Sequence, residues 1–274
     1  MISVGVIACL YGQPELLNNC LSPWFELKKE LNIKIGAVHG LFKENYELGV
    51  KDNDKETLFK LLSAYEKGLI DYLFAQSLDE PIKYRTEAEL RDKGLKFCLN
   101  ENVDYVFLLD IDEKYSKDEI RALVNYIQLP DNKFYDWFRI NFKNYVFSGK
   151  EWIDGFKPPR IFKVKTGNNN CCILDSFFWD NDVRYKIGNR LVSYETLPSK
   201  EISKRIAHIK HLTWLNNEKS HLKVLYHEKH FGPPKGFGCS YKWDEEKKTL
   251  AFNLDYYKKT GQSLPEIHVD TDNV

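Results

Sequence analysis

The architecture of this chain follows from ten residues, Asp104-Tyr-Val-Phe-Leu-Leu-Asp-Ile-Asp-Glu113. The apolar run at 105–109 has the length and composition of a strand that is buried on both faces. The run ends abruptly in three acids, Asp110, Asp112 and Glu113, and burying unpaired carboxylates inside a strand is too costly. We therefore expect the acids at the carboxyl end of the strand, where open α/β sheets bind their ligands.

The spacing of two of these acids suits a metal ion. Carboxylates at positions i and i+2 around a turn, as in Asp110 and Asp112, can both reach one hard cation. Such a cation prefers oxygen ligands and can also hold phosphate oxygens. The sequence therefore predicts a metal–diphosphate site at the end of this strand.

Strand and helix signals alternate through the first half of the chain. Strands are predicted at 3–10, 33–39, 71–75 and 105–109, and helices from Gln13, at 57–67, at 86–100 and at 116–127. Capping boxes, Thr86 with Glu89 and Ser116 with Glu119, start the last two helices. This order predicts an α/β fold with a mainly parallel central sheet and flanking helices.

The second half is less regular. We predict a strand at 134–147, a turn plus strand at 152–165, a loop at 167–170, a helix at 218–230 and a Gly/Pro-rich segment at 232–238. The tail from Ser263 is predicted to be poorly ordered. Because no linker is visible, we expect one continuous domain.

The composition excludes some partners. The 274 residues carry 40 basic and 40 acidic side chains, so no global field attracts nucleic acid. No run of about 18 apolar residues occurs, so no transmembrane segment is expected. The apolar N-terminus lacks the basic region of a signal peptide. We therefore predict a cytoplasmic protein whose six cysteines are reduced and mostly in the core.

Four motifs, in this order, resemble family 2-like glycosyltransferases of the GT-A fold. Ile7-Ala-Cys-Leu-Tyr-Gly-Gln-Pro-Glu-Leu-Leu-Asn-Asn-Cys-Leu-Ser22 resembles their opening strand, loop and helix. Arg91-Asp-Lys-Gly94 is similar to their Arg-Asn-x-Gly, and residues 104–113 resemble their strand followed by a DxD motif. Ile209-Lys-His-Leu-Thr-Trp214, with two lysines after it, resembles their late histidine motif.

This resemblance implies a GT-A, Rossmann-like fold with an irregular C-terminal half. It implies a nucleotide-sugar-binding half at 1–125, an acceptor-side and metal-completing half of the same domain at 126–262, and a tail at 263–274. Arg91 would lie near the nucleotide or the donor sugar. The residues that would hold the nucleoside follow the first two strands: Ala8, Cys9, Tyr11, His39, Gly40 and Leu41.

The resemblance also implies a metal centre. Asp112 would bind the metal directly, and Asp110 would hold the metal or the ribose, with Ile111 between them at the donor site. His211, or with less support His208, would be the further metal ligand. Mn²⁺ or Mg²⁺ suits aspartate oxygens, and an added imidazole favours Mn²⁺.

Charged residues further along the chain are candidates for the rest of the reaction. Three lysines are candidates to close over the diphosphate, with 232–238 as a mobile lid: Lys219, Lys223 and Lys235. Asp154 and Asp182 are candidate general bases for an acceptor hydroxyl. The predicted activity is a metal-dependent hexosyl transfer from a nucleotide sugar, with a UDP-sugar as the expected donor, to a carbohydrate or other hydroxyl acceptor.

Three alternatives stay open. Haloacid-dehalogenase-like phosphatases also use a strand followed by DxD, but typically with a threonine where this chain has Lys114. A non-catalytic module that binds nucleotide sugars or glycans would keep the same fold. His208 and His211, at i and i+3, would share one helix face as a zinc pair, although no further ligand has convincing spacing.

Overall fold

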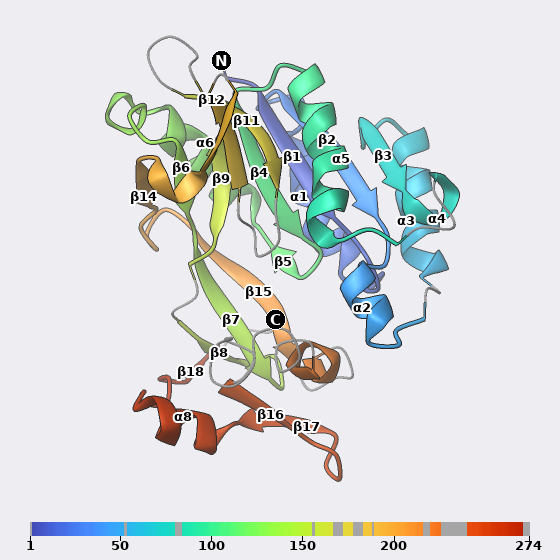
Figure 1. The fold of residues 1–274 in the computed structure, drawn as a ribbon, viewed down its shortest axis with the longest axis vertical. Coiled ribbons are helices and arrows are strands. Elements are labelled where there is room, and N and C mark those ends of the chain that lie inside the picture. Colours follow the sequence, from blue (N-terminus) through green and yellow to red (C-terminus); the bar gives the residue numbers. More distant parts are fainter. Residues whose placement is uncertain are drawn as a thin grey trace. The chain divides into compact units, whose positions relative to one another are not determined.

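A computed structural model (Figure 1) describes residues 2–51, 54–79, 84–154, 157–166, 172–177, 183–187, 189–215, 220–225 and 240–270. The chain divides into two compact units. The first combines Met1–Asn141 with Lys157–Ile209, and the second combines Phe142–Phe156 with Lys210–Val274. Each unit is made of two separate parts of the chain.

The first unit is built on a seven-stranded sheet with the order β14-β6-β9-β4-β1-β2-β3. Its strands are β1 (Val4–Cys9), β2 (Ile33–His39), β3 (Tyr72–Ala75), β4 (Tyr105–Asp110), β6 (Trp137–Arg139), β9 (Pro159–Lys163) and β14 (Ser199–Glu201). Strands β3, β2, β1 and β4 run parallel, whereas β9 is antiparallel to both β4 and β6. The predicted α/β class with a mainly parallel sheet is confirmed.

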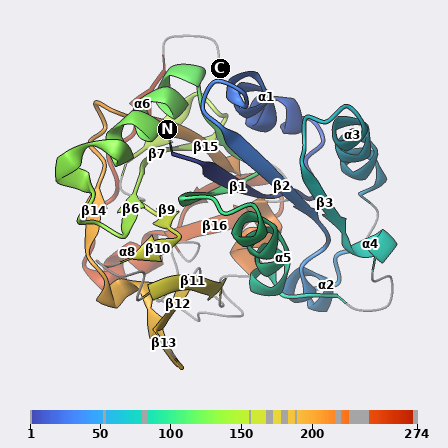
Figure 2. The same cartoon turned by 90° about the horizontal axis from the view of Figure 1, so that it is seen from above.

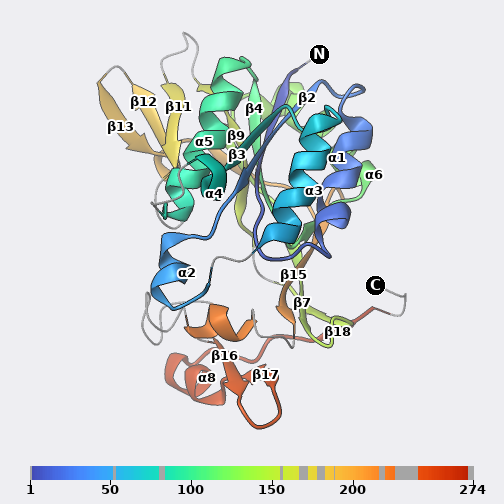
Figure 3. The same ribbon diagram turned by 90° about the vertical axis from the view of Figure 1, so that its right-hand side faces the viewer.

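Helices cover both faces of this sheet (Figures 2 and 3). One face carries α1 (Leu17–Leu27), α3 (Lys55–Glu66) and α6 (Lys117–Gln128), and the other carries α5 (Glu87–Asn100). Short helices follow β2, β3, α6 and β13: α2 (Lys43–Glu47), α4 (Gln76–Asp79), η1 (Pro130–Asn132) and η3 (Tyr194–Thr196). Both predicted capping boxes, at Thr86 and Ser116, are present.

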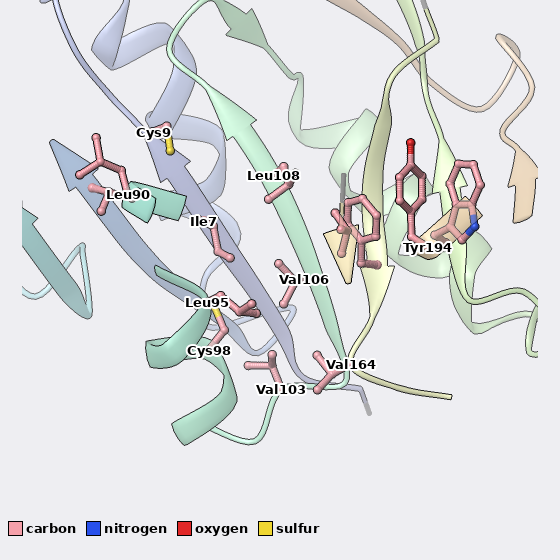
Figure 4. Close-up of a cluster of buried hydrophobic side chains, with 14 of the residues drawn as sticks. Ile7, Cys9, Leu90, Leu95, Cys98, Val103, Val106, Leu108, Val164 and Tyr194 are labelled. Atoms are coloured by element: carbon pink, nitrogen blue, oxygen red, sulfur yellow. The ribbon is translucent and has the colours of Figure 1, made fainter. Parts of the chain in front are cut away.

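Alternating side chains of β1 and β4 form the core under α5 (Figure 4). Ile7 of β1 and two residues of β4, Val106 and Leu108, belong to this buried cluster together with Leu95 of α5. Successive residues of a strand point to opposite faces. Asp110, two residues beyond Leu108, therefore extends from β4 on the face that α5 covers.

Helix α5 approaches the sheet closely because both surfaces carry glycine at the contact. A Cβ atom added at Gly94 of α5 would lie 2.7 Å from Cγ2 of Ile7, and one at Gly5 of β1 would lie 2.6 Å from Sγ of Cys98. Side chains at these positions would push the helix away from the sheet. The close contact lets the N-terminal turns of α5 reach the strand ends.

Short strands complete the first unit. A four-stranded sheet contains β10 (Lys165–Thr166), β11 (Cys172–Phe177), β12 (Val183–Ile187) and β13 (Arg190–Ser193), and β5 (Glu113–Lys114) follows β4 directly. Cys9, Cys20 and Cys98 are buried free thiols, as predicted. None of the helices in the described part of the chain has the length and apolarity that crossing a membrane requires.

The second unit contains four adjacent strands in the order β18-β8-β7-β15, a hairpin and a helix. Their bounds are β7 (Asn141–Phe147), β8 (Glu151–Ile153), β15 (His208–Leu215), β16 (Tyr241–Asp244), β17 (Thr249–Phe252), α8 (Leu254–Thr260) and β18 (His268–Val269). Residues 220–225, within the predicted helix at 218–230, are helical. The Gly/Pro-rich segment 232–238 and the loop 167–170 lie outside the described residues.

The prediction of one strand over 134–147 is wrong. The segment forms two strands, β6 and β7, that lie in different sheets. The pairing of β6 with β9 shifts register between Phe138 and Arg139. Ile140, Asn141 and Phe142 are then all buried in succession, so the alternation of a single strand is lost.

Two further differences concern the second unit. Trp152 belongs to strand β8 instead of a turn. The prediction of a poorly ordered tail from Ser263 is wrong for residues 268–270. Strand β18 pairs with β8, and the Asp270 carboxylate accepts hydrogen bonds from the hydroxyl of Tyr145 and, at 3.0 Å, from Nε1 of Trp152. The division of roles at residue 125 stays a prediction.

Candidate functional site

The parallel strands bring the candidate residues of the first unit to one edge of the sheet. Cys9 at the end of β1 lies in register with both Val38 of β2 and Asp110 of β4. His39 at the end of β2 lies in register with Ala75 of β3. The acids thus end β4 beside the ends of β1 and β2.

Asp110 is held between two buried arginines. Its Oδ1 accepts a hydrogen bond from Nη2 of Arg91 at 2.8 Å, and its Oδ2 accepts one from Nη2 of Arg160 at 2.7 Å. The side chains of Arg91 and Arg160 are 3% and 4% exposed, whereas that of Asp110 is 26% exposed. Arg91 also pairs with Glu87, one turn earlier in α5.

Both arginines stay cationic in spite of their burial. Burial disfavours the charged guanidinium, but the nearby carboxylates outweigh it and raise the pKa of both Arg91 and Arg160. A buried charge is tolerated only when it is paired and hydrogen-bonded in this way. Two buried positive charges therefore contact the partly exposed carboxylate of Asp110.

Arg160 also binds Glu113. Oε1 of Glu113 lies 2.6 Å from Nη2 and 2.8 Å from Nε of Arg160, and its Oε2 accepts a hydrogen bond from Tyr115 at 3.1 Å. Burial raises the pKa of Glu113 to about 8; Arg160 opposes this rise and two neighbouring aspartates reinforce it. Glu113 is therefore held by Arg160 and Tyr115 inside the protein. Its place next to the DxD motif in the sequence did not predict these contacts.

Asp112 lies in the turn between β4 and β5 and is 7% exposed. Ile111 beside it is 8% exposed, and Sγ of Cys20 in α1 donates to the carbonyl of Asp110 at 3.4 Å. No group of three metal-binding side chains occurs among the described residues. One or two carboxylates nevertheless fit a Mg²⁺-like ion that completes its coordination with substrate phosphates and water.

The end of β2 receives an acid from another part of the chain. Asp54, the N-cap residue of α3, accepts hydrogen bonds from backbone N–H groups of Gly12 and, at 3.3 Å, Thr57. Its Oδ2 lies 3.4 Å from Nε2 of His39, which is 2% exposed. The ring of Tyr11 packs against His39 with ring centroids 5.4 Å apart. Asp54 therefore joins the first loop to the end of the second strand.

These contacts control the charge of Asp54. Burial opposes its ionisation, but the hydrogen bonds from His39, Gly12 and Thr57 outweigh burial and lower the pKa of Asp54 from 3.8 to about 2. A carboxylate that accepts several hydrogen bonds is stabilised in its charged form. Asp54 is therefore ionised at neutral pH.

Sequence reasoning missed Arg160 and Asp54 for different reasons. Arg160 reaches the site only because β9 inserts antiparallel beside β4, and no local pattern announces that pairing. Asp54 carried a usable signal, because an aspartate three residues before Thr57 has the spacing of an N-cap. That signal indicates the start of a helix but not its contact with His39.

Three of the predicted residues belong to the second unit. Nδ1 of His211 lies 2.8 Å from Oδ1 of Asn144, which is fully buried. An amide oxygen only accepts, so Nδ1 of His211 carries the proton and Nε2 carries the lone pair that a metal would need. Asp154 follows β8, and Lys223 lies in the helical segment 220–225.

Four further predicted residues are His208 and three that the structure does not describe. The zinc pair on a helix face is wrong, because His208 and His211 lie in strand β15, where residues three apart point to opposite faces. The backbone N–H of His208 donates to Oε1 of Glu119 at 3.2 Å. Lys219, Lys235 and Asp182 lie outside the described residues.

Glu44 in α2 is a further buried acid near the same edge, 4% exposed. Burial raises the pKa of Glu44, with a smaller contribution from the charge of Glu87. A carboxyl whose pKa is raised on folding loses stability as the pH rises above its unfolded value of 4.5. The charged form of Glu44 therefore destabilises the fold at neutral pH.

Glu44→Gln is expected to raise the free energy of unfolding by roughly 1 kcal/mol at pH 8, and the gain should disappear as the pH falls to 4. Urea unfolding at both pH values measures it. Glu47→Gln, at a side chain that is 48% exposed, is the matched control and should change little. Equal stability of Glu44→Gln and the wild type at pH 8 would contradict the cost assigned to this carboxylate.

Comparisons with known proteins show a partial likeness to solved structures. No family model and no curated protein matches the chain. Among solved structures, it is similar to that of a cytidylyltransferase from Leptospira borgpetersenii serovar Hardjo-bovis, with a TM-score of 0.34 and 13% sequence identity. The match covers 59% of this chain and 59% of that one. A functional assignment therefore has to come from the site residues.

Proposed function

We propose that this protein is a metal-dependent glycosyltransferase that transfers a hexose from a nucleotide sugar, with a UDP-sugar as the expected donor, to a hydroxyl acceptor. One observation carries the proposal. Asp110 ends the buried strand β4 beside the end of β1, and Asp112 follows in the next turn, at the edge where parallel α/β sheets bind ligands. The order of Arg91, Asp110 and Asp112 along the chain is the order in which the resembling motifs occur in GT-A enzymes.

Each residue of this edge has a task in the proposal. Asp112 would hold Mn²⁺ or Mg²⁺ together with the donor diphosphate, and the ion would supply positive charge to the departing nucleoside diphosphate. Asp110, oriented by its two arginines, would hold a ribose hydroxyl or the ion. Tyr11, His39 and Asp54 would contact the nucleoside.

The other residues of the proposal come from later parts of the chain. His211 would be a further metal ligand, and its hydrogen bond to Asn144 gives the ring the tautomer that ligation by Nε2 needs. Lys219, Lys223 and Lys235 would contact the diphosphate. Asp154 and Asp182 are the candidate bases for the acceptor hydroxyl.

Asp112→Asn is expected to abolish the Mn²⁺-dependent part of UDP binding, a loss of roughly 100-fold in affinity, because an amide is a poor ligand for a hard cation. Calorimetric titration of UDP with and without Mn²⁺ measures it. Asp118→Asn is the control, because the Asp118 side chain is 96% exposed on α6. UDP affinity that is the same in Asp112→Asn and the wild type, with Mn²⁺ present, would contradict the proposed site.

A non-catalytic nucleotide-sugar-binding module is the second candidate. Two arginines balance the charge of Asp110, and the described residues include no set of three metal-binding side chains. Slow Mn²⁺-dependent hydrolysis of a UDP-sugar would favour the enzyme. Binding with no turnover across a panel of donors and acceptors would favour the module.

The phosphatase alternative gains no support. In that class the first aspartate of the motif attacks phosphate as a nucleophile. Both carboxylate oxygens of Asp110 are hydrogen-bonded to arginines, which reduces their nucleophilicity. This chain also has Lys114 at the position where that class typically has threonine.

A further inference from the structure

Arg160 touches both ends of the acidic turn. Its Nη2 lies 2.7 Å from Oδ2 of Asp110 and 2.6 Å from Oε1 of Glu113, and its Nε donates to the same Oε1 at 2.8 Å. The guanidinium is planar and rigid, so its donors fix the separation of the two carboxylates. Arg160 therefore bridges the residues that flank Ile111 and Asp112.

Other contacts also anchor the two ends of the turn. Cys20 holds the carbonyl of Asp110, and Tyr115 holds the second oxygen of Glu113. Arg160 comes from β9, which pairs with β4 in the sheet. The position of Asp112 is thus tied to the rigid sheet through a side chain that does not belong to the DxD motif.

We propose that Arg160 is a positioning residue: by bridging Asp110 and Glu113 it fixes the turn that presents Asp112 to a divalent cation carried by a nucleoside diphosphate. This inference rests on the proposed function, in the form in which Asp110 holds the ion and not a ribose hydroxyl. Support of this kind matters, because replacing residues that orient metal ligands typically lowers metal affinity about 10–100-fold. Arg160 lies on β9, and two strands, β4 and β1, separate β9 from β2. The end of β2 carries His39, which contacts Tyr11 and Asp54, the residues proposed to bind the nucleoside.

Lysine at this position is the informative replacement. It keeps the positive charge, but its three donors sit on one nitrogen at the end of a flexible stem. The contact of Nε with Oε1 of Glu113 is lost, and no planar group fixes the distance between the two acids. A role confined to charge neutralisation would therefore survive Arg160→Lys. A role in holding the turn would not, because the two carboxylates would no longer be bound by one rigid group.

We expect Arg160→Lys to lower the affinity for Mn²⁺·UDP about 10–100-fold while the affinity for uridine changes less than about twofold. Calorimetric titrations of the full chain with uridine, UDP and Mn²⁺·UDP measure this split. Arg121→Lys is the matched control. Nε and Nη2 of Arg121 also donate to one carboxylate, that of Glu30, at 2.8 and 2.9 Å, but this pair lies on the surface. The control should bind all three probes as the wild type does.

A second variant protects the test against loss of folding. Glu113→Gln keeps the size of the side chain but replaces the carboxyl group, which contacts Arg160 through Oε1 and Tyr115 through Oε2, by an amide with a single oxygen. The same split between Mn²⁺·UDP and uridine is expected. Unchanged Mn²⁺·UDP affinity in both variants would overturn the positioning role alone. An equal loss of uridine and Mn²⁺·UDP affinity would overturn it as well. A wild type that binds neither UDP nor Mn²⁺·UDP would overturn the proposed function and this inference with it.

Discussion

Arg91→Met is expected to lower the free energy of unfolding by about 3–5 kcal/mol, because it leaves a partly buried Asp110 without one of its two cations. Arg91 is 3% exposed and pairs with Asp110 and Glu87. Methionine fills much of the same volume, so the loss reports the ion pairs more than the packing. The carboxylate of Asp110 would lose the contact with Arg91 and keep the contact with Arg160.

Urea unfolding followed by circular dichroism measures this loss. Arg121→Met is the control, because Arg121 and its partner Glu30 are 40% and 49% exposed, and breaking such a solvent-exposed pair changes stability little. If Arg91→Met and Arg121→Met destabilise the protein equally, the buried pair between Arg91 and Asp110 contributes no more than a surface pair.

Trp24→Ala is expected to destabilise the first unit by about 3–5 kcal/mol, since it opens a large void between α1 and the sheet. The Trp24 side chain is fully buried. Its ring meets Phe107 of β4 edge-on at 5.5 Å and Tyr115 at 5.4 Å. Because Tyr115 donates to Glu113, the same void lies behind the acidic turn.

Thermal unfolding of Trp24→Ala and Trp24→Phe separates the loss of buried apolar volume from the loss of the indole shape. Nε1 of Trp24 has no hydrogen-bond partner among the described residues, so Trp24→Phe removes a buried polar atom along with some volume. Trp24→Phe should therefore cost much less than Trp24→Ala. A phenylalanine variant as unstable as the alanine variant would show that the indole shape, and not buried apolar volume, supports α1.

The first half of the fold was predictable because its signals are local. The predicted strand at 33–39 matches β2 to the residue, and the capping boxes at Thr86 and Ser116 begin α5 and α6 as expected. The second half was less predictable because its strands pair over long distances. β9 inserts between β4 and β6, and the register shift at Phe138 breaks a run that reads as one strand.

The site divides in the same way. The position of Asp110 and Asp112 followed from the cost of burying carboxylates in a strand, which is a property of the local sequence. Arg160 required the antiparallel pairing of β9 with β4. The contact of Asp54 with His39 required knowledge of where α3 begins in space. Acids at strand ends are therefore readable from sequence, whereas the groups that neutralise and orient them are not.

The strand order of the second unit has a consequence for synthesis on the ribosome. β7 and β8 form a hairpin whose outer edges are covered by β15 on one side and β18 on the other. Both covering strands are translated long after the hairpin, with a large part of the first unit in between. The nascent chain must therefore carry a hairpin with two open edges, the kind of surface that pairs with other chains. Premature release of the polypeptide would leave those edges exposed permanently.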